Sequence, residues 1–295
     1  MSWRDGYIAV DWGTTNRRAY AVDAGGRVTE SFEDELGLMA VPVGGFEAAA
    51  AAITARLGDR PMLLAGMVGS NRGWREAAYV PCPAGADELA AKLLWIQPGR
   101  IAIVPGVCQK GAAGADVMRG EEVQVLGAVA AGLAPPDCLI CHPGTHAKWI
   151  RMEGGRIASF RTMMTGELFS LLSKHSILGA QLEGEAVPND AFRDAARNAL
   201  GGAELLAGLF GVRARFLLGE GEDDGASFAS GLLIGSDVRA GLAIAADQPG
   251  PIVLMGRPDL CALYAAALAE AGRETIEVDG AEAFLAGIQL LTEML

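Results

Sequence analysis

Residues 7–18 read YIAVDWGTTNRR, and the interpretation of the whole chain depends on this stretch. The β-branched and aromatic run up to Trp12 predicts a buried strand, and residues 13–15 predict a glycine turn at its end. A second strand is expected near 18–22 and a third near 27–32, joined by a Gly-Gly turn. Short strands joined by glycine turns favour an antiparallel meander.

The same pattern starts again in the second half of the chain, where residues 137–148 read DCLICHPGTHAK. In both halves a Gly-Thr pair is followed by a cation at the fourth place after the glycine, Arg17 or Lys148, and then by a strand and a Gly-Gly turn. The distance from Gly-Thr to Gly-Gly differs by two residues. Chance resemblance in a chain with 40 glycines would explain this, and so would duplication of one module. Duplication would give two similar domains that face each other across a cleft.

The remaining pattern alternates strands with helices, which is typical of α/β architecture. Further strands are expected at 61–68, 101–105, 251–255 and 275–278, and helices at 46–57, 121–132, 165–180, 190–212, 225–245, 259–272 and 281–294. We expect two α/β domains with mixed sheets, residues 1–134 and 135–295, with the last helix returning toward the first domain.

Composition narrows the class of protein. Half of the residues are apolar (51%), which is enough for a core at 295 residues. The net charge of −12 disfavours nucleic acid or an anionic membrane surface as a partner. The N-terminus lacks the pattern of a signal peptide, and no uninterrupted apolar run reaches transmembrane length. These features predict a cytoplasmic protein whose five cysteines are reduced.

The first glycine turn suits a phosphate and its metal ion. Gly13 lets the backbone approach an anion, and the amides of Thr14, Thr15 and Asn16 can form a concavity around it. The threonine hydroxyls can donate to phosphate oxygens, and Asp11 could hold Mg²⁺ directly or through water. An ordinary hairpin whose Asp11 caps the turn would explain the same residues, so this alternative stays open.

The second turn contains Gly144 and Thr145, and together the two hairpins could grip a triphosphate from opposite sides. Lys148 or Arg17 could neutralise phosphate charge, although either could equally be solvated. The Cys138–His142 stretch also matches a c-type haem attachment pattern, but a buried strand explains its cysteines better. No P-loop and no dinucleotide-binding glycine motif occurs.

Both turns resemble the phosphate loops of the acetate and sugar kinase, chaperone and actin superfamily. Within it the chain resembles 2-dehydro-3-deoxygalactonokinases, in AGMVGSNRGW (65–74), DVMRGEEVQVLGA (116–128), HPGTHAKW (142–149) and FRTMMTGEL (160–168). One departure from the wider superfamily is His142, where many members have Asp, so a metal site would depend more heavily on Asp11. Gly256, in a strand-to-helix turn, resembles the glycine beside adenine and ribose, although Asp259 as an N-cap would explain that turn equally well.

The resemblance implies the actin-like fold, ATP and Mg²⁺ as cofactors, and transfer of the γ-phosphate to the 6-hydroxyl of 2-dehydro-3-deoxy-D-galactonate. Such a transfer needs positioning, charge neutralisation and a base for the attacking hydroxyl. Glu121, at the positive N-terminus of a predicted helix, is the first candidate for this base, and Asp116, expected on the preceding loop, is the second. The alternative is that Glu121 and Glu122 only cap the helix.

A sugar acid also presents a carboxylate and hydroxyl groups. The candidates to bind it are Arg72 and Arg161 for the carboxylate, Ser70, Asn71, Thr165 and Glu167 for hydroxyls, and Trp74 for the apolar face of the sugar. Each of these could instead be a solvated loop residue. A kinase for another sugar acid such as 2-dehydro-3-deoxygluconate, and a non-catalytic nucleotide-dependent binding protein of the same fold, remain alternatives. The sequence leaves a homodimer open.

Overall fold

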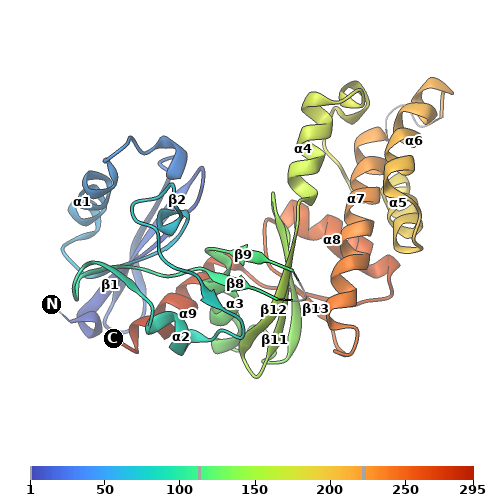
Figure 1. Cartoon of the computed structure of the whole chain (residues 1–295). Coiled ribbons are helices and arrows are strands. Elements are labelled where there is room, and N and C mark those ends of the chain that lie inside the picture. The colour runs from blue at the N-terminus through green and yellow to red at the C-terminus, as the bar shows by residue number, and fades with distance from the viewer. Residues whose placement is uncertain (1, 112–113, 221–223) are drawn as a thin grey trace. The chain divides into compact units, whose positions relative to one another are not determined.

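The computed structural model describes residues 2–111, 114–220 and 224–295. The chain divides into two compact units (Figure 1). The first unit comprises Met1–Pro136, Glu153–Ser159 and Gly280–Leu295, and the second comprises Asp137–Met152 and Phe160–Asp279.

The main sheet of the first unit confirms the predicted meander. Its strands lie in the order β3 (Val28–Asp34), β2 (Arg17–Asp23), β1 (Gly6–Trp12), β4 (Met62–Gly66), β7 (Ile101–Ile103) and β6 (Leu94–Gln97). β1 pairs antiparallel with β2, and β2 with β3. β4 is parallel to β1, and β7 is parallel to β4. The sheet is therefore mixed, as expected.

The core of the first unit lies between this sheet and helix α1 (Phe46–Leu57). Side chains alternate along a strand, so Ile8, Val10 and Trp12 share one face of β1. They pack in one buried cluster with Phe46 and Ile53 of α1. Almost every residue of β1 is buried, because this central strand is covered on both faces.

Helices α3 (Glu121–Ala130) and α9 (Gly280–Thr292) also pack together in the first unit. Two glycines allow the close approach. A Cβ on Gly127 would lie 2.0 Å from the carbonyl oxygen of Ala283, and one on Gly287 would lie 2.0 Å from that of Val123. The sequence prediction missed a small sheet of the first unit, β5 (Val80–Pro81), β8 (Val107–Gln109) and β9 (Asp116–Met118), together with β6 and helix α2 (Ala86–Ala90).

The sheet of the second unit repeats the first. Its order is β12 (Arg156–Met163), β11 (Ala147–Glu153), β10 (Cys138–His142), β13 (Ile252–Leu254) and β14 (Thr275–Glu277). β10 pairs antiparallel with β11 and parallel with β13, and β13 is parallel to β14. This is the order β3-β2-β1-β4-β7 of the first sheet, so the similarity of the two hairpins extends to the topology of both sheets and favours duplication over chance.

Helices α4 (Thr165–His175), α5 (Asp190–Leu200), α6 (Leu205–Leu217), α7 (Gly225–Leu242) and α8 (Pro258–Glu270) complete the second unit. The helical stretch expected at 190–212 is two helices, α5 and α6, with Gly202 between them at a φ of +95°. Short 3₁₀ helices lie at Trp3–Asp5, Leu38–Ala40, Met67–Gly69, Gly179–Leu182 and Ala243–Ala245.

Among the described residues, one helix, Gly225–Ala245, is long and apolar enough to cross a membrane. Most of it is buried inside the second unit, and α7 packs closely against α5. A Cβ on Gly231 would lie 2.3 Å from the carbonyl oxygen of Phe192. These contacts are those of a core helix.

Candidate active site

The first glycine loop, residues 13–16, is held rigidly by a neighbouring segment. The Gly13 N–H donates to the Asn16 carbonyl at 2.9 Å. The N–H groups of residues 37, 38 and 39 donate to the carbonyls of Thr15, Gly13 and Thr14, at 3.0, 3.0 and 3.1 Å. These bonds leave the side chains of Thr14, Thr15 and Asn16 exposed, which is the arrangement that a phosphate-binding turn requires.

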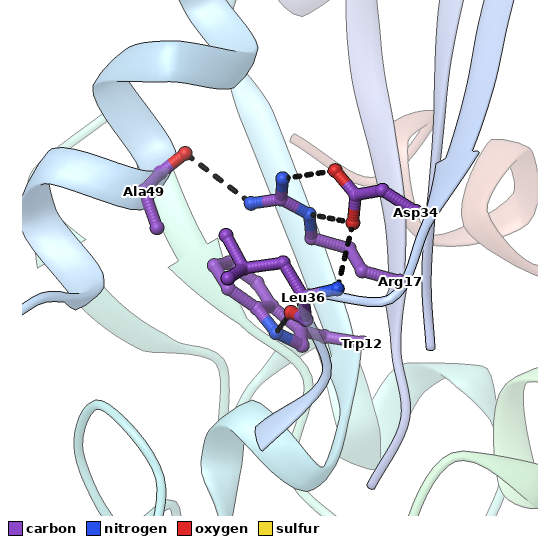
Figure 2. Close-up of polar contacts among 5 residues, drawn as sticks. All are labelled: Trp12, Arg17, Asp34, Leu36 and Ala49. Carbon is purple, nitrogen blue, oxygen red and sulfur yellow. Dashed lines mark hydrogen bonds and ion pairs between the residues drawn. The ribbon is translucent and has the colours of Figure 1, made fainter. Parts of the chain in front are cut away.

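Arg17 directly follows this loop, and Figure 2 shows its guanidinium bonded to Asp34 and to the Ala49 carbonyl. Its guanidinium is 4% exposed and donates twice to Asp34, at 2.6 and 3.2 Å, and once to the Ala49 carbonyl at 3.3 Å. The Trp12 indole N–H donates to the Leu36 carbonyl at 2.9 Å, and the Leu36 N–H donates to Asp34 at 3.2 Å. Arg17 is therefore not a solvated cation, since Asp34 and the Ala49 carbonyl accept from its guanidinium. A part for Arg17 in neutralising phosphate charge stays a prediction.

Asp11, one residue from the end of β1, lies in a negative environment. It pairs across the sheet with Arg18. Burial is the main reason that the pKa of Asp11 is raised to about 6; the charge of Arg18 opposes the rise, and the charges of Glu121 and Glu33 add to it. A carboxylate whose pKa is raised by neighbouring carboxylates suits the binding of a cation.

Three segments converge at the carboxyl ends of the parallel strands β1 and β4. Trp12 and Gly66 are paired, and a Cβ on Gly66 would lie 2.7 Å from the Trp12 carbonyl oxygen. A Cβ on Gly120 would lie 3.3 Å from the Gly66 Cα. The Asp11 end of β1, the turn after β4 and the loop before α3 therefore meet, at the edge where open α/β sheets bind ligands.

The two candidate bases differ in their surroundings. Glu121 is the first residue of α3, is half-buried, and accepts the Arg119 N–H at 3.2 Å. The sequence predicts a loop position for Asp116, but this residue begins β9, opposite Gln109. Its side chain accepts the Val117 N–H at 2.8 Å. Glu121 lies close enough to Asp11 for its charge to raise the pKa of Asp11.

The sequence analysis did not identify the burial of Arg119 and Glu122, which flank the loop before α3. Glu122 has no exposed surface, and its carboxylate accepts the Gly120 N–H at 2.7 Å. Arg119 is 8% exposed, donates to the Ala77 carbonyl at 2.7 Å, and lies over the Tyr79 ring at 4.3 Å. The run Arg-Gly-Glu-Glu gives no sign of which side chains are buried, so the sequence held no signal for this.

The turn after β4 carries the candidate sugar-acid residues of the first unit. Ser70 is 8% exposed, and its hydroxyl accepts the Arg72 N–H at 3.3 Å. Asn71 and Arg72 are exposed, and Trp74 is half-buried against the core. Arg72 and Trp74 line a pocket of about 250 Å³ with residues of the 41–47 segment.

The second glycine loop is capped by the N-terminus of α4. Thr145 is exposed, and its carbonyl accepts the Glu167 N–H at 2.9 Å. A Cβ on Gly166 would lie 2.5 Å from the Gly144 carbonyl oxygen, so only glycine fits there. The His146 ring lies 2.5 Å from the Glu167 carboxylate.

The other candidates of the second unit are more widely distributed. Lys148 is 5% exposed and donates to the His146 carbonyl at 3.3 Å. Gly256 lies between β13 and α8, where its Cβ would be 3.0 Å from the Pro143 carbonyl oxygen, so this turn touches the second loop. Arg161 is exposed on β12. Arg161, like Thr165 and Glu167, belongs to the second unit, whereas residues 70–74 belong to the first.

A pocket of about 560 Å³ opens beside the second loop. Its lining includes Gly144, Thr145, Thr165 and Gly166, apolar side chains of α7 and α8, Tyr264, and the charged side chains of Glu185, Arg257 and Asp259. The pocket thus combines a glycine loop and a helix N-terminus, which favour phosphate, with apolar walls that favour a flat ring system.

No group of three or more His, Cys, Asp or Glu side chains able to hold a metal ion by themselves occurs among residues 2–111, 114–220 and 224–295. Mg²⁺ in phosphoryl-transfer enzymes is commonly held by one or two carboxylates together with substrate phosphates and water. Asp11, whose pKa is raised in part by the charge of Glu121, fits this kind of site.

Comparison with known proteins gives the family. The model of the 2-keto-3-deoxy-galactonokinase family matches residues 11–291. The 2-dehydro-3-deoxygalactonokinase of Escherichia coli K12 is 38% identical over 286 residues, 96% of each chain. A solved structure from Sinorhizobium meliloti, provisionally identified as a 2-dehydro-3-deoxygalactonokinase, superposes with a TM-score of 0.90 at 36% identity and covers 98% of both chains.

A more distant structure shows the fold alone. The activator of 2-hydroxyisocaproyl-CoA dehydratase from Clostridium difficile, solved with ADPNP, gives a TM-score of 0.51 at 12% identity over 98% of this chain. The fold is the actin-like α/β fold with mixed sheets. The chain belongs to the 2-keto-3-deoxy-galactonokinase family and is a carbohydrate kinase.

Proposed function

We propose that this kinase transfers the γ-phosphate of ATP to the 6-hydroxyl of 2-dehydro-3-deoxy-D-galactonate, as a cytoplasmic step of galactonate catabolism. The observation that carries the proposal is 38% identity over 96% of both chains to a kinase named for this substrate. The glycine loops and the pocket of the second unit support it, because they supply groups of the kind that a nucleotide requires.

We assign the nucleotide to the second unit. The 560 Å³ pocket offers Gly144, Thr145 and the N-terminus of α4 for phosphates, and apolar walls for the base. Gly256 lies in the turn that contacts the second loop. We assign this turn to contact with the ribose or the base. The exposed side chains of Thr14, Thr15 and Asn16 in the first unit are assigned to the terminal phosphates. Lys148 is buried and helps to shape the second loop.

We assign the acceptor to the first unit. Ser70, Asn71 and Arg72 offer hydroxyl, amide and guanidinium donors for the sugar acid, and Trp74 offers an apolar face. Glu121 is the proposed base for the 6-hydroxyl, with Asp116 as the second candidate. Arg161, Thr165 and Glu167 are the candidates of the second unit for this substrate, but Thr165 donates to Asp237 of α7 and the Glu167 carboxylate contacts His146 beside the second loop.

Asp11 is the residue proposed to hold Mg²⁺, which would neutralise charge on the transferred phosphoryl group. In the protein itself, Glu121 accepts the proton of the sugar hydroxyl as the oxygen attacks phosphorus. The donors of the two glycine loops hold the phosphate oxygens in place during the transfer.

One experiment tests the proposal. ADP release is measured by a coupled assay over a panel that includes the 2-dehydro-3-deoxy acids of galactonate and gluconate, with Mg²⁺ present and absent. The galactonate acid should give the highest kcat/KM, and ³¹P NMR should place the phosphate on C6. Preference for the gluconate acid would favour the kinase of that epimer. Nucleotide binding without turnover on any acid would favour a binding protein.

A further inference from the structure

Asp237 is a buried carboxylate that no part of the proposed chemistry uses. It lies on α7 in the core of the second unit and is 4% exposed. We propose that Asp237 is a positioning residue that holds the N-terminus of α4 in place through Thr165 and thereby keeps the nucleotide pocket in its binding shape. This inference rests on the proposed assignment of the nucleotide to the second unit.

Three donors from three different elements converge on Asp237. The Trp149 indole N–H of β11 donates to one carboxylate oxygen at 2.5 Å. The Tyr264 hydroxyl of α8 donates to the other at 2.6 Å, and the Thr165 hydroxyl of α4 donates to that same oxygen. Both oxygens are therefore occupied, and one side chain ties β11, α4 and α8 to α7.

The three donors stabilise the ionised form of Asp237. Burial raises the pKa of Asp237, and the three hydrogen bonds, which favour the ionised form, act against that rise. A buried carboxylate that loses a donor stays desolvated without that compensating hydrogen bond. Loss of any one of the three donors is therefore costly.

The bond to Thr165 matters for the pocket because Thr165 is the first residue of α4. The next two residues lie directly on the second glycine loop. Gly166 has no room for a Cβ against the Gly144 carbonyl, and the Glu167 N–H donates to the Thr145 carbonyl at 2.9 Å. A helix start fixed at Thr165 therefore fixes the loop at residues 144–145.

The same pocket is lined by Thr165 and Gly166 on one side and by Tyr264 on another. Two of the three donors to Asp237 are thus wall residues, and Asp237 itself is not among the lining side chains. Loss of the Thr165 bond would free the start of α4 to shift, which would change the groups that contact phosphates without touching residues 70–74 of the first unit.

A role in core stability alone predicts a different result. If Asp237 only stabilises the second unit, a variant lowers Tm but leaves nucleotide and sugar-acid affinities unchanged in the folded fraction. If it positions α4, ADP affinity falls while the KM of the sugar acid stays nearly constant.

The sharpest variant is Thr165→Val, which keeps the shape of the side chain and removes one donor. Because the start of α4 then loses its hydrogen bond to a charged group, the Kd of ADP measured by calorimetry should rise roughly tenfold or more. The KM of the sugar acid should change less than about twofold, because the substitution weakens the binding of the nucleotide and leaves the residues assigned to the sugar acid in the first unit unchanged. Ser173→Ala is the matched control: it removes a hydroxyl of the same helix that donates to the Phe169 carbonyl within α4, and it should leave the Kd unchanged.

Asp237→Asn completes a double-mutant cycle. The amide can still bond to Thr165 and Tyr264, whose hydroxyls can rotate to accept, so its effect should be smaller than that of Thr165→Val. Because both changes act on one hydrogen bond, their combination should fall short of the product of the single effects. An unchanged ADP Kd in Thr165→Val, or effects that multiply fully, would overturn the inference. If the wild-type protein itself fails to bind ADP, the proposed function fails instead.

Discussion

The carboxylate of Glu122 holds the backbone N–H of Gly120 at 2.7 Å from a position with no exposed surface. Gly120 has a φ of +112°, a conformation that other residues rarely adopt, and it immediately precedes Glu121. The buried side chain thus fixes the bend from which the proposed base projects. The two adjacent glutamates, which look equivalent in the sequence, differ in their surroundings, since Glu122 is buried and Glu121 is half-buried.

The burial of Glu122 predicts a pH dependence of stability. Burial first, and then the charge of Glu121, raise the pKa of Glu122 from its ordinary value of 4.5 to about 8, although Arg119 and two backbone N–H groups oppose the rise. Between these values the folded protein keeps a proton that the unfolded chain has lost, so this group makes the free energy of unfolding fall as pH rises, by up to about 1.4 kcal/mol per pH unit. Urea melts at pH 5, 6, 7 and 8 measure this, and Glu122→Gln, which cannot ionise, should have a flatter profile. Parallel profiles for the two proteins would show that Glu122 is ionised in the fold.

Glu121→Gln tests the base. Loss of a general base should lower kcat for the sugar acid by roughly 10²-fold or more, with little change in ATP affinity. The coupled ADP assay gives kcat, and calorimetry gives the Kd of ADP. Asp116→Asn, which alters the second candidate, is the comparison. If Asp116→Asn shows the large loss and Glu121→Gln does not, the role of base belongs to Asp116.

Asp11→Asn tests the metal assignment. The amide has nearly the same shape as the carboxylate but lacks its charge, so it should weaken the contribution of Mg²⁺ to nucleotide binding. We expect the ratio of the Kd of ATP without Mg²⁺ to that with Mg²⁺ to shrink toward one. Calorimetric titrations with and without EDTA measure both constants independently of turnover. A ratio equal to that of the wild type would remove Asp11 from the metal site.

Much of the fold could be predicted from local pattern. The β-branched and aromatic run of β1 and the glycine turns predict the meander, and the alanine-rich run at 46–57 predicts α1 at its observed bounds by its composition and length. The small sheet of β5, β8 and β9 was missed, since its strands of two or three residues have no periodicity to read.

The candidate site could likewise be predicted only in part from the sequence. The loops at residues 13–16 and 144–145 could be predicted because a tight turn favours glycine, and glycine is visible in the sequence. The partners of Asp237 lie 27 to 88 residues away along the chain, and such contacts leave no local signal. The same reason explains Arg17, which looks like a free cation in the sequence yet is fixed by Asp34.

Arg17 and Asp34 make a testable anchor under the first loop. Asp34→Ala would leave a nearly buried guanidinium without its carboxylate and should lower the free energy of unfolding by about 1.5–3 kcal/mol. Arg17→Lys keeps the charge but loses the two-pronged geometry, and should be nearly as costly. Arg27→Lys is the control, because Arg27 pairs with Asp23 while 84% exposed and should change stability by less than about 0.5 kcal/mol. Urea melts at pH 7 compare the four proteins, and equal midpoints would show that the anchor contributes nothing.

The contact of α3 with α9 gives the last prediction. Gly127→Ala would place a methyl carbon 2.0 Å from the Ala283 carbonyl oxygen and 2.3 Å from the Gly287 nitrogen. Both are backbone atoms of a helix, so no side chain can rotate away and the helices must separate. Overpacking of this kind costs about 1–3 kcal/mol or more, and it should appear as a lower urea midpoint.

Gly211→Ala makes the matched comparison, since Gly211 also lies inside a helix, α6, but its Cβ would meet nothing within 4 Å. There the alanine should stabilise the protein by about 0.5–1 kcal/mol, because it restricts the unfolded chain and favours the helix. Opposite signs for the same substitution would show that glycine at 127 is required by the helix contact and not by the local backbone. A stabilising Gly127→Ala would mean that α3 and α9 lie farther apart in solution than their backbones lie here.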